Sequence, residues 1–275
     1  MEGMEQPLVS CIMPTRNRRH FVEQALRYFE QQDYPNKELI IVDDGDDLVV
    51  DLVSQRPNVR YFAPQYIHSV GAKRNFACEV ARGEIICHWD DDDWYSASRL
   101  SYQVAPFLTR NADITGLHLH SVFDLQHMQG WRCEDAHALT PGVEGMHYGT
   151  MLYRKHLWMT RSRFHDSPKG DDGSGFVRRL LNQGARAYTL PCIEHQVYVR
   201  HGSNIWKYQP GTTINHERWQ PIKPEQCFNS QDLEFYRNIH FQLKQPAIVN
   251  AALFRKHIGK SLARRLTPLF FCLKR

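Results

Sequence analysis

The chain has 275 residues, 42% hydrophobic and 23% charged, so it is long enough for a large core and its composition excludes wholesale disorder. The formal net charge of +4 excludes a globally basic nucleic-acid binder, because residues 247–275 hold seven basic residues and no acidic one. The remaining 27 basic residues face 30 acidic ones, so residues 1–246 are slightly acidic.

Two further features of the composition concern location. The seven cysteines are scattered without a C-x-x-C pair, which is typical of a reducing compartment rather than of a disulfide framework. The start of the chain lacks an apolar run, and no stretch reaches the roughly 18 apolar residues of a membrane-spanning helix. We therefore expect a cytoplasmic protein without a secretory signal.

The first hundred residues alternate strand and helix patterns. Four runs have the apolar character of buried strands: 9–13, 38–42, 60–62 and 84–89. Helical spacing predicts one helix after the first run and another over 71–81. This β-α-β order predicts an α/β fold, Rossmann-like, with a mostly parallel sheet flanked by helices. Acidic clusters follow two of the strands, at the carboxyl ends where such sheets gather their ligands.

The second half has a less regular pattern. The predicted elements there are strands at 113–125, 147–153, 187–190 and 196–200, and a short helix at 175–182. No linker separates the two halves, so we expect one domain over 7–215. Residues 216–275 are then a C-terminal helical extension.

The densest acidic cluster is the run of four aspartates from Asp90 to Asp93. Carboxylates this close raise one another's pKa unless a cation is present. A solvated acidic turn is the alternative interpretation. The apolar strand before the run and Trp94 after it favour instead a buried site for a hard divalent cation, Mn²⁺ or Mg²⁺.

Four blocks in order give the chain a family resemblance. They are VSCIMPTRN from position 9, ELIIVDDG from 38, GAKRN from 71 continuing through ARGEII at 81–86, and DDDDW from 90. With these blocks the chain resembles the family 2 glycosyltransferases, which have the GT-A fold. The D-x-D pattern within the last block is the family's metal and donor motif.

The resemblance implies roles for residues at the first two strand ends. Pro14, Thr15 and Arg16 would line the nucleotide pocket, with Arg16 replacing an aromatic residue common in the family. Asp43 and Asp44 match the family's uridine-binding acidic pair, in which Asp44 would accept a hydrogen bond from the base. A plain strand-end turn is the alternative for this pair.

The resemblance also implies roles around the acidic run. Arg74 and Asn75 would lie on a helix that faces the donor, and Asp90 would contact the donor ribose or sugar. Asp91 would belong to the same donor-binding group, with its contact left open, as is the role of Asp93. Asp92 would bind the metal ion.

Two later segments complete the site that the resemblance implies. A carboxylate base must deprotonate the acceptor hydroxyl. In KGDDGSGF the second acid, Asp172, would be that base, with Asp171 as the second choice and a helix cap as the alternative role. His201, in the segment RHGSN, would add an imidazole ligand to the metal.

A competing metal site is suggested by His118 and His120, which share a strand face. Together with His127 or Cys133 they would form a zinc site. The spacing defines two ligands at most, so we favour a strand face on the acceptor side.

The basic tail carries apolar residues at helical spacing from Ile248 to Leu266. A basic amphipathic helix of this kind can lie on an anionic membrane surface, at the inner face of the membrane. Alternatively, it docks on the domain with its charged face in solvent.

The resemblance implies a metal-dependent, inverting glycosyltransferase. It would move a sugar from a nucleotide donor, UDP-linked, to a hydroxyl of a glycan or lipid-linked acceptor in cell-surface glycan, lipopolysaccharide or polysaccharide synthesis. A nucleotidyltransferase and a non-catalytic sugar-nucleotide- or glycan-binding module stay open as alternatives. No nucleic-acid-binding module is visible.

Overall fold

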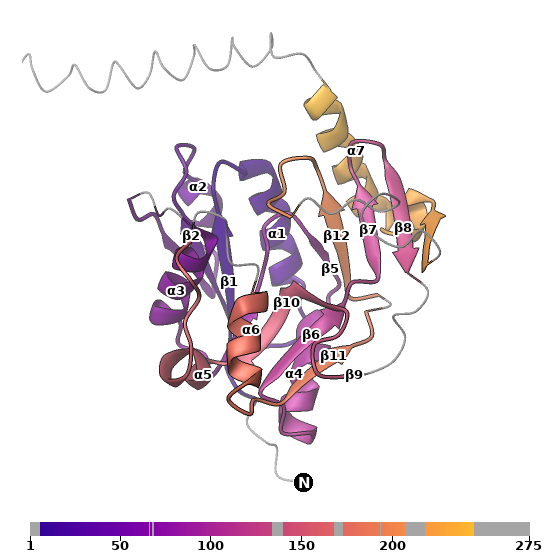
Figure 1. Cartoon of the computed structure of the whole chain (residues 1–275). Helices are drawn as coiled ribbons and strands as arrows, with labels where there is room; N and C mark the ends of the chain where they lie inside the picture. The colour runs from indigo at the N-terminus through magenta and orange to yellow at the C-terminus, as the bar shows by residue number, and fades with distance from the viewer. Residues whose placement is uncertain are drawn as a thin grey trace, which may run out of the picture. The chain divides into compact units, whose positions relative to one another are not determined.

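The computed structural model describes residues 6–65, 67, 69–133, 140–167, 173–192, 194–206 and 218–244 (Figure 1). The chain divides into two compact units, Met1–Phe228 and Asn229–Arg275. The domain boundary predicted at 215 and the basic tail both lie outside the described residues. None of the described helices is long and apolar enough to cross a membrane.

The first unit is built on an eight-stranded mixed sheet. Its strands, in spatial order, are β3 (Val59–Phe62), β2 (Lys37–Asp43), β1 (Val9–Thr15), β4 (Ile85–His88), β10 (Met146–Arg154), β6 (Ile114–His118), β11 (Ala187–Leu190) and β9 (Thr140–Pro141). The first four are parallel, and β10 runs antiparallel to both β4 and β6. The predicted α/β class with a mostly parallel sheet is confirmed.

A smaller sheet lies beyond the end of the first. Its strands, in spatial order, are β13 (Trp219–Ile222), β8 (Gln129–Cys133), β7 (Ser121–Asp124), β12 (Gln196–Arg200) and β5 (Trp94–Tyr95). The strand predicted over 113–125 is therefore two strands, since β6 belongs to the large sheet and β7 to the small one. Residues from late in the chain thereby come next to the acidic run, because β12 pairs with β5 directly after it.

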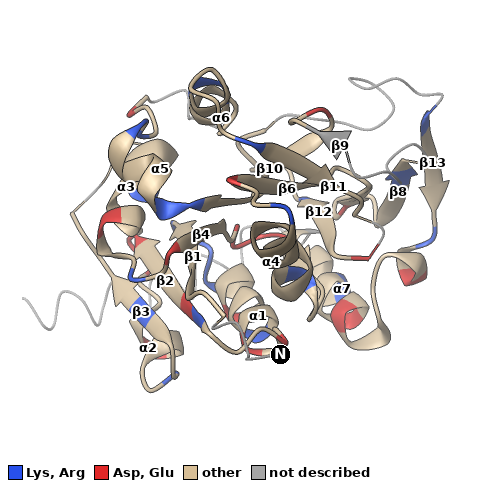
Figure 2. Ribbon diagram, turned by 90° about the horizontal axis from the view of Figure 1, so that it is seen from below, with Lys and Arg blue, Asp and Glu red and all other residues tan. Residues whose placement is uncertain are grey.

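Helices cover both faces of the large sheet, as Figure 2 shows. Their bounds are α1 (Arg19–Glu30), α2 (Val50–Val53), α3 (Val70–Val80), α4 (Arg99–Thr109), α5 (Lys155–Thr160) and α6 (Ser174–Leu181). Successive strand residues point to opposite faces, so Cys11 packs with α1 and α4 while Ile12 packs with α3, α5 and α6. The second unit contains α7 (Ser230–Lys244), which the sequence pattern did not predict.

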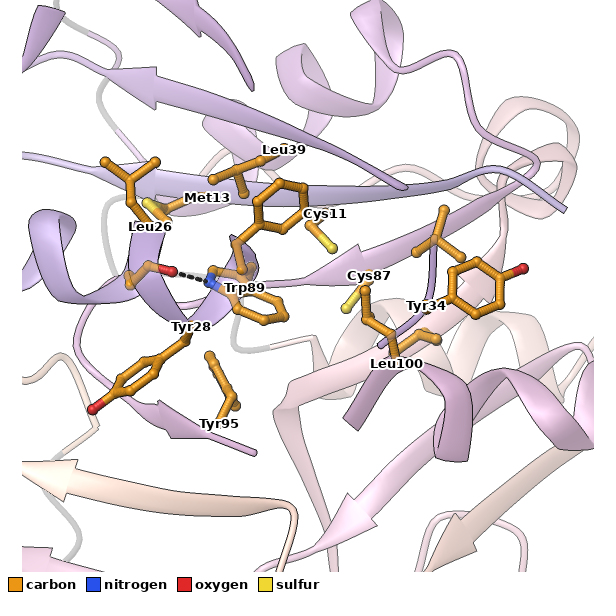
Figure 3. Close-up of a cluster of buried hydrophobic side chains, with 14 of the residues drawn as sticks. Cys11, Met13, Leu26, Tyr28, Tyr34, Leu39, Cys87, Trp89, Tyr95 and Leu100 are labelled. Carbon is orange, nitrogen blue, oxygen red and sulfur yellow. Dashed lines mark hydrogen bonds between the residues drawn. The ribbon is translucent and has the colours of Figure 1, made fainter. Parts of the chain in front are cut away.

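The core on the α1 side ends directly beneath the acidic run. Trp89 is fully buried there, and its indole nitrogen donates to the carbonyl oxygen of Ala25 in α1 at 3.3 Å (Figure 3). Its ring also packs against Phe29 and Tyr95. Trp89 immediately precedes Asp90, so packing of this ring holds the start of the run in place.

Helix α3 approaches the chain so closely at Gly71 that a side chain does not fit there. A Cβ at this position would overlap the backbone carbonyl oxygen of His165. The helix carries Lys73 and Arg74, both buried, two and three residues further on. The close contact therefore also sets where these two cations lie.

We expect Gly71→Ala to destabilise the protein by about 1–3 kcal/mol, the usual cost of overpacking. At a helix position with free space for a side chain, the same change would stabilise the protein by roughly 1 kcal/mol. The sign of the change in the free energy of unfolding therefore distinguishes a crowded position from an open one. The exposed Glu79→Ala in the same helix is the control and should change the free energy by less than about 0.5 kcal/mol. Denaturant unfolding measures both, and a gain in stability for Gly71→Ala would contradict the expectation.

Candidate functional site

A cavity of about 910 Å³ lies at the carboxyl ends of β1, β2 and β4. Residues from the first half that line it are Pro14, Thr15, Arg16, Asn17, Arg18, Asp44, Ile67, Ser69, Val70, Lys73, Arg74, Asp90, Asp91 and Asp92. Residues from the second half that line it are Met146, His147, Tyr148, Gly149, Tyr198, Ser203, Asn204, Ile205 and Trp206. The predicted site residues Asp43, Asn75 and His201 are not part of this lining.

The two aspartates after β2 have different surroundings. Asp44 faces the cavity, where its carboxylate forms an ion pair with Lys73 and accepts a hydrogen bond from the backbone of Ile67 at 3.2 Å. The Asp43 carboxylate accepts instead from the backbone of Gly45 and from the phenol of Tyr61, at 3.0 and 2.9 Å. Asp43 thus stabilises the turn after β2, whereas Asp44 is paired with Lys73 beside the cavity.

Helix α3 places two consecutive cations at the cavity. Lys73 Nζ, besides pairing with Asp44, donates to the carbonyl oxygen of Thr15 at 3.0 Å. The next residue, Arg74, lies with its guanidinium 3.6 Å from Asp90. Asn75 points away, since its amide bonds the backbone of Phe164 and its Oδ1 accepts from Trp158. In this structure Asn75 therefore holds the segment after α5 against α3.

The middle of the acidic run is held by an arginine that the sequence analysis did not single out. Arg18 Nη1 donates to Asp91 Oδ1 at 2.8 Å and to Asp92 Oδ2 at 2.7 Å. Thr15 donates to the other oxygen of Asp91 at 2.6 Å. Although burial raises the pKa of Asp92, Arg18 and the hydrogen bond from His201 bring it below its usual value. The sequence feature that could have identified Arg18 as a site residue is its position, three residues after the end of the parallel strand β1.

The last aspartate of the run is buried and tied to the small sheet. Asp93 accepts from the Gln196 side chain at 2.7 Å and from the backbone of Val199 at 3.0 Å. Burial, together with the neighbouring carboxylates, raises the pKa of Asp93 well above its usual value. The same amide nitrogen of Gln196 contacts His147 Nδ1 at 3.1 Å.

The first aspartate of the run also has a raised pKa. Burial raises the pKa of Asp90 to about 6, with the charges of Asp92 and Asp91 adding to the rise and Arg74 opposing it. Asp90 faces the cavity next to Gly149 and Arg74. Its charge therefore responds to any cation or anion that enters.

His201 lies next to Asp92, and its role as a metal ligand stays a prediction from the resemblance. Its Nε2 donates to Asp92 Oδ2 at 2.9 Å, and its Nδ1 contacts Ser203 Oγ at 2.9 Å. Asn204 fixes the loop by accepting from the backbone of His201 at 2.8 Å. His201 is 6% exposed and does not line the cavity itself, whereas its partner Asp92 does.

The residues predicted to bind Mn²⁺ or Mg²⁺ do not fit an ion in this arrangement. Oxygen-rich ligands suit these metals chemically. However, Asp92 Oδ2 already accepts from both Arg18 and His201. Within the described part of the chain, no group of three or more His, Cys, Asp or Glu side chains is arranged to hold a metal ion, neither here nor at the histidines considered for zinc.

The segment that holds the predicted base directly precedes α6 in the sequence. Asp171 and Asp172 lie outside the described residues, and α6 begins just after them at Ser174. Gly173 precedes the helix in a left-handed conformation with φ of 97°, where its missing Cβ avoids strain.

Aromatic rings form one wall of the cavity, which the sequence analysis also missed. The His147 ring stacks on Trp206 with centroids 5.8 Å apart and meets Tyr198 edge-on at 5.2 Å. These rings come from β10, β12 and the loop after β12. His147 lies far from the other two residues in the sequence and on a different sheet from Tyr198. No periodic sequence pattern could therefore predict that the three rings meet.

Comparison with known proteins gives one family. The sequence model of glycosyl transferase family 2 matches residues 10–155. The putative colanic acid biosynthesis glycosyl transferase WcaA of Escherichia coli K12 is 36% identical over 104 residues, which cover 36% of this chain and 37% of that protein. The Escherichia coli protein named UDP-Glc:alpha-D-GlcNAc-diphosphoundecaprenol beta-1,3-glucosyltransferase WfgD is 29% identical over 113 residues, covering 39% and 44%. The chain thus matches less than half the length of either relative.

A solved structure has a similar fold. Residues 1–349 of S. aureus TarS, crystallised in complex with UDP-GlcNAc, superpose with a TM-score of 0.59 at 18% sequence identity. The match covers 74% of this chain and 61% of the TarS chain. At this level of identity the likeness concerns the fold alone.

We expect acid to destabilise the protein through His147. Burial lowers the pKa of His147 to about 4, from about 6.5 in the unfolded chain, so between these values the unfolded state binds the proton and the native state does not. From pH 7 to pH 5 the native protein should therefore lose about 2 kcal/mol relative to His147→Gln.

Urea unfolding across this pH range measures the difference. The exposed His156→Gln is the control, and its profile should run parallel to that of the unchanged protein. Parallel profiles for His147→Gln as well would show that His147 does not resist protonation.

Proposed function

The chain belongs to glycosyl transferase family 2, and we propose that it transfers a sugar from a UDP-linked donor to a hydroxyl group of a lipid-linked saccharide. The observation that carries the proposal is that the family's motif residues meet in one cavity. Thr15, Asp44, Arg74 and the Asp90–Asp92 run come from four separate segments and line the same space. A transferase needs this convergence, because nucleotide, diphosphate and sugar must be held together.

The donor nucleotide would enter between the ends of β1 and β2. Asp44 would accept a hydrogen bond from the N–H of the uracil ring, with the ion pair to Lys73 holding the carboxylate in place. The diphosphate would then lie towards Arg74 and the acidic run, and the sugar near Asp90. The UDP-GlcNAc named for the TarS complex supports a UDP-linked donor.

The acceptor saccharide would pack on the aromatic wall. A sugar ring has an apolar face as well as hydroxyl groups, and aromatic side chains supply large contact areas of this kind at ligand sites. Trp206 is 43% exposed beside the cavity, so part of its ring is accessible to an acceptor. The acceptor in the name of WfgD, a diphosphoundecaprenol-linked sugar, supports a lipid-linked acceptor in cell-surface polysaccharide synthesis.

In the proposed reaction the acceptor oxygen attacks the anomeric carbon as the bond to the diphosphate breaks. Asp172 would take the hydroxyl proton, and attack opposite the leaving group would invert the configuration. Negative charge develops on the departing UDP, and cations placed beforehand lower the barrier. Arg74 is one such cation in the cavity. The requirement for Mn²⁺ or Mg²⁺ stays a prediction from the sequence.

The reaction class is tested by incubating the protein with a panel of UDP- and GDP-sugars. We expect UDP to be released from a UDP-sugar. Asp44→Asn should weaken UDP binding at least tenfold, because the amide presents an N–H where the base offers one. Release of pyrophosphate from a nucleoside triphosphate would instead indicate a nucleotidyltransferase. Binding of UDP-sugar with no turnover, even with saccharide-lipid acceptors, would indicate a binding module.

The base is tested separately with Asp172→Asn and Asp171→Asn. For Asp172→Asn we expect kcat to fall about 10²- to 10⁴-fold, the usual contribution of a general base. The dissociation constant for UDP-sugar should stay unchanged, because the base contacts the acceptor. Asp171→Asn is the matched neighbour and should retain more activity. An active Asp172→Asn enzyme would remove Asp172 from the mechanism.

A further inference from the structure

The guanidinium of Arg18 lies at the acidic run in the way that a bound metal ion would. The residue directly precedes α1, and one of its nitrogens, Nη1, donates to Asp91 Oδ1 and Asp92 Oδ2 at 2.8 and 2.7 Å. The side chains of these aspartates are 2% and 9% exposed, and that of Arg18 is 24% exposed. A single positive charge thus bridges two buried negative ones, as a bound ion would.

Hydrogen-bond donors occupy both oxygens of Asp91 and Oδ2 of Asp92. Thr15 donates to Asp91 Oδ2 at 2.6 Å, and His201 donates to the same oxygen of Asp92 that Arg18 contacts, at 2.9 Å. A metal ion would need lone pairs of these oxygens at about 2.0–2.2 Å. It would also lie within a few ångströms of a guanidinium, which stays charged because Asp91 and Asp92 outweigh the effect of burial on its pKa.

We propose that Arg18 is the resident counter-ion of Asp91 and Asp92, and that a divalent metal ion binds these carboxylates only in competition with it. The guanidinium holds the run in shape when no metal is bound, and a metal enters when this side chain turns outward. Besides the two carboxylates, Arg18 makes one long contact, from Nη2 to the carbonyl oxygen of Ser203 at 3.5 Å. The side chain is therefore tethered mainly by the charges for which a metal would compete.

The neighbouring arginine supplies a matched control. Arg19 also lies at the start of α1, but it pairs with Asp47 and Asp51, whose side chains are 58% and 63% exposed. Neutralising Arg19 changes the net charge by the same amount at nearly the same place in the sequence. It leaves the contacts of Asp91 and Asp92 intact.

The experiment measures binding of Mn²⁺ alone to the full chain, by calorimetry and by the electron paramagnetic resonance signal of free Mn²⁺. We expect Arg18→Met to bind Mn²⁺ at least tenfold more tightly than the unchanged protein. Arg18→Lys, which retains the charge, and Arg19→Met should stay within about threefold of the unchanged protein. No nucleotide or acceptor is needed, so the result does not depend on the proposed sugar transfer.

A second measurement uses thermal unfolding. Without Arg18 the two carboxylates repel each other, so Arg18→Met should melt at a lower temperature, and Mn²⁺ should raise its Tm more than that of the unchanged protein. Arg18→Gln gives the same comparison if the methionine variant does not fold. Equal Mn²⁺ affinity in the unchanged protein and the neutral Arg18 variants would overturn the proposal, as would an equal gain in Arg18→Lys or Arg19→Met.

Discussion

The structure depends on compensating the negative charge of four consecutive aspartates at the buried end of β4. Carboxylates removed from water need hydrogen-bond donors or opposite charges, and an uncompensated one would cost several kcal/mol. The chain meets this need with groups from three distant segments. They are Thr15 at the end of β1 with Arg18 beyond it, Arg74 on α3, and the segment of β12 and its following loop, which supplies Gln196, the backbone of Val199, His201 and Asn204.

This compensation links the two sheets of the first unit. β4 belongs to the large sheet, whereas β12 belongs to the small one and pairs with β5 just beyond the run. The hydrogen bonds to Asp92 and Asp93 therefore hold β12 and the loop after it beside the acidic run, and Tyr198 of β12 lines the same cavity as the run. Stability and the proposed chemistry use the same carboxylates, so substitutions in the run should affect both.

Sequence patterns predicted the regular half of the fold better than the rest. The strands of the parallel half were found because each contains a short run of mostly apolar residues. Helix α4 was missed: Arg99 and Gln103 are fully buried where a helix normally shows apolar residues, and Pro106 lies in the last turns. Arg99 is tolerated there because it donates to the carbonyl oxygen of His88 at 2.7 Å and packs over Tyr95. No local pattern predicts such a buried arginine, since its partners lie on other elements.

For the candidate site, the sequence alone determined that carboxylates follow buried parallel strands, and parallel strands end at one edge of a sheet. That rule and the family motifs brought Asp44, Arg74 and the acidic run to one place. Only the tertiary structure decided that the Asp43 carboxylate accepts a hydrogen bond within its own turn, and that Arg18 and His201 both contact Asp92. The reason is physical: strand ends follow from local chain geometry, whereas the partner of a buried charge is whichever donor the packing of distant segments brings within about 3 Å.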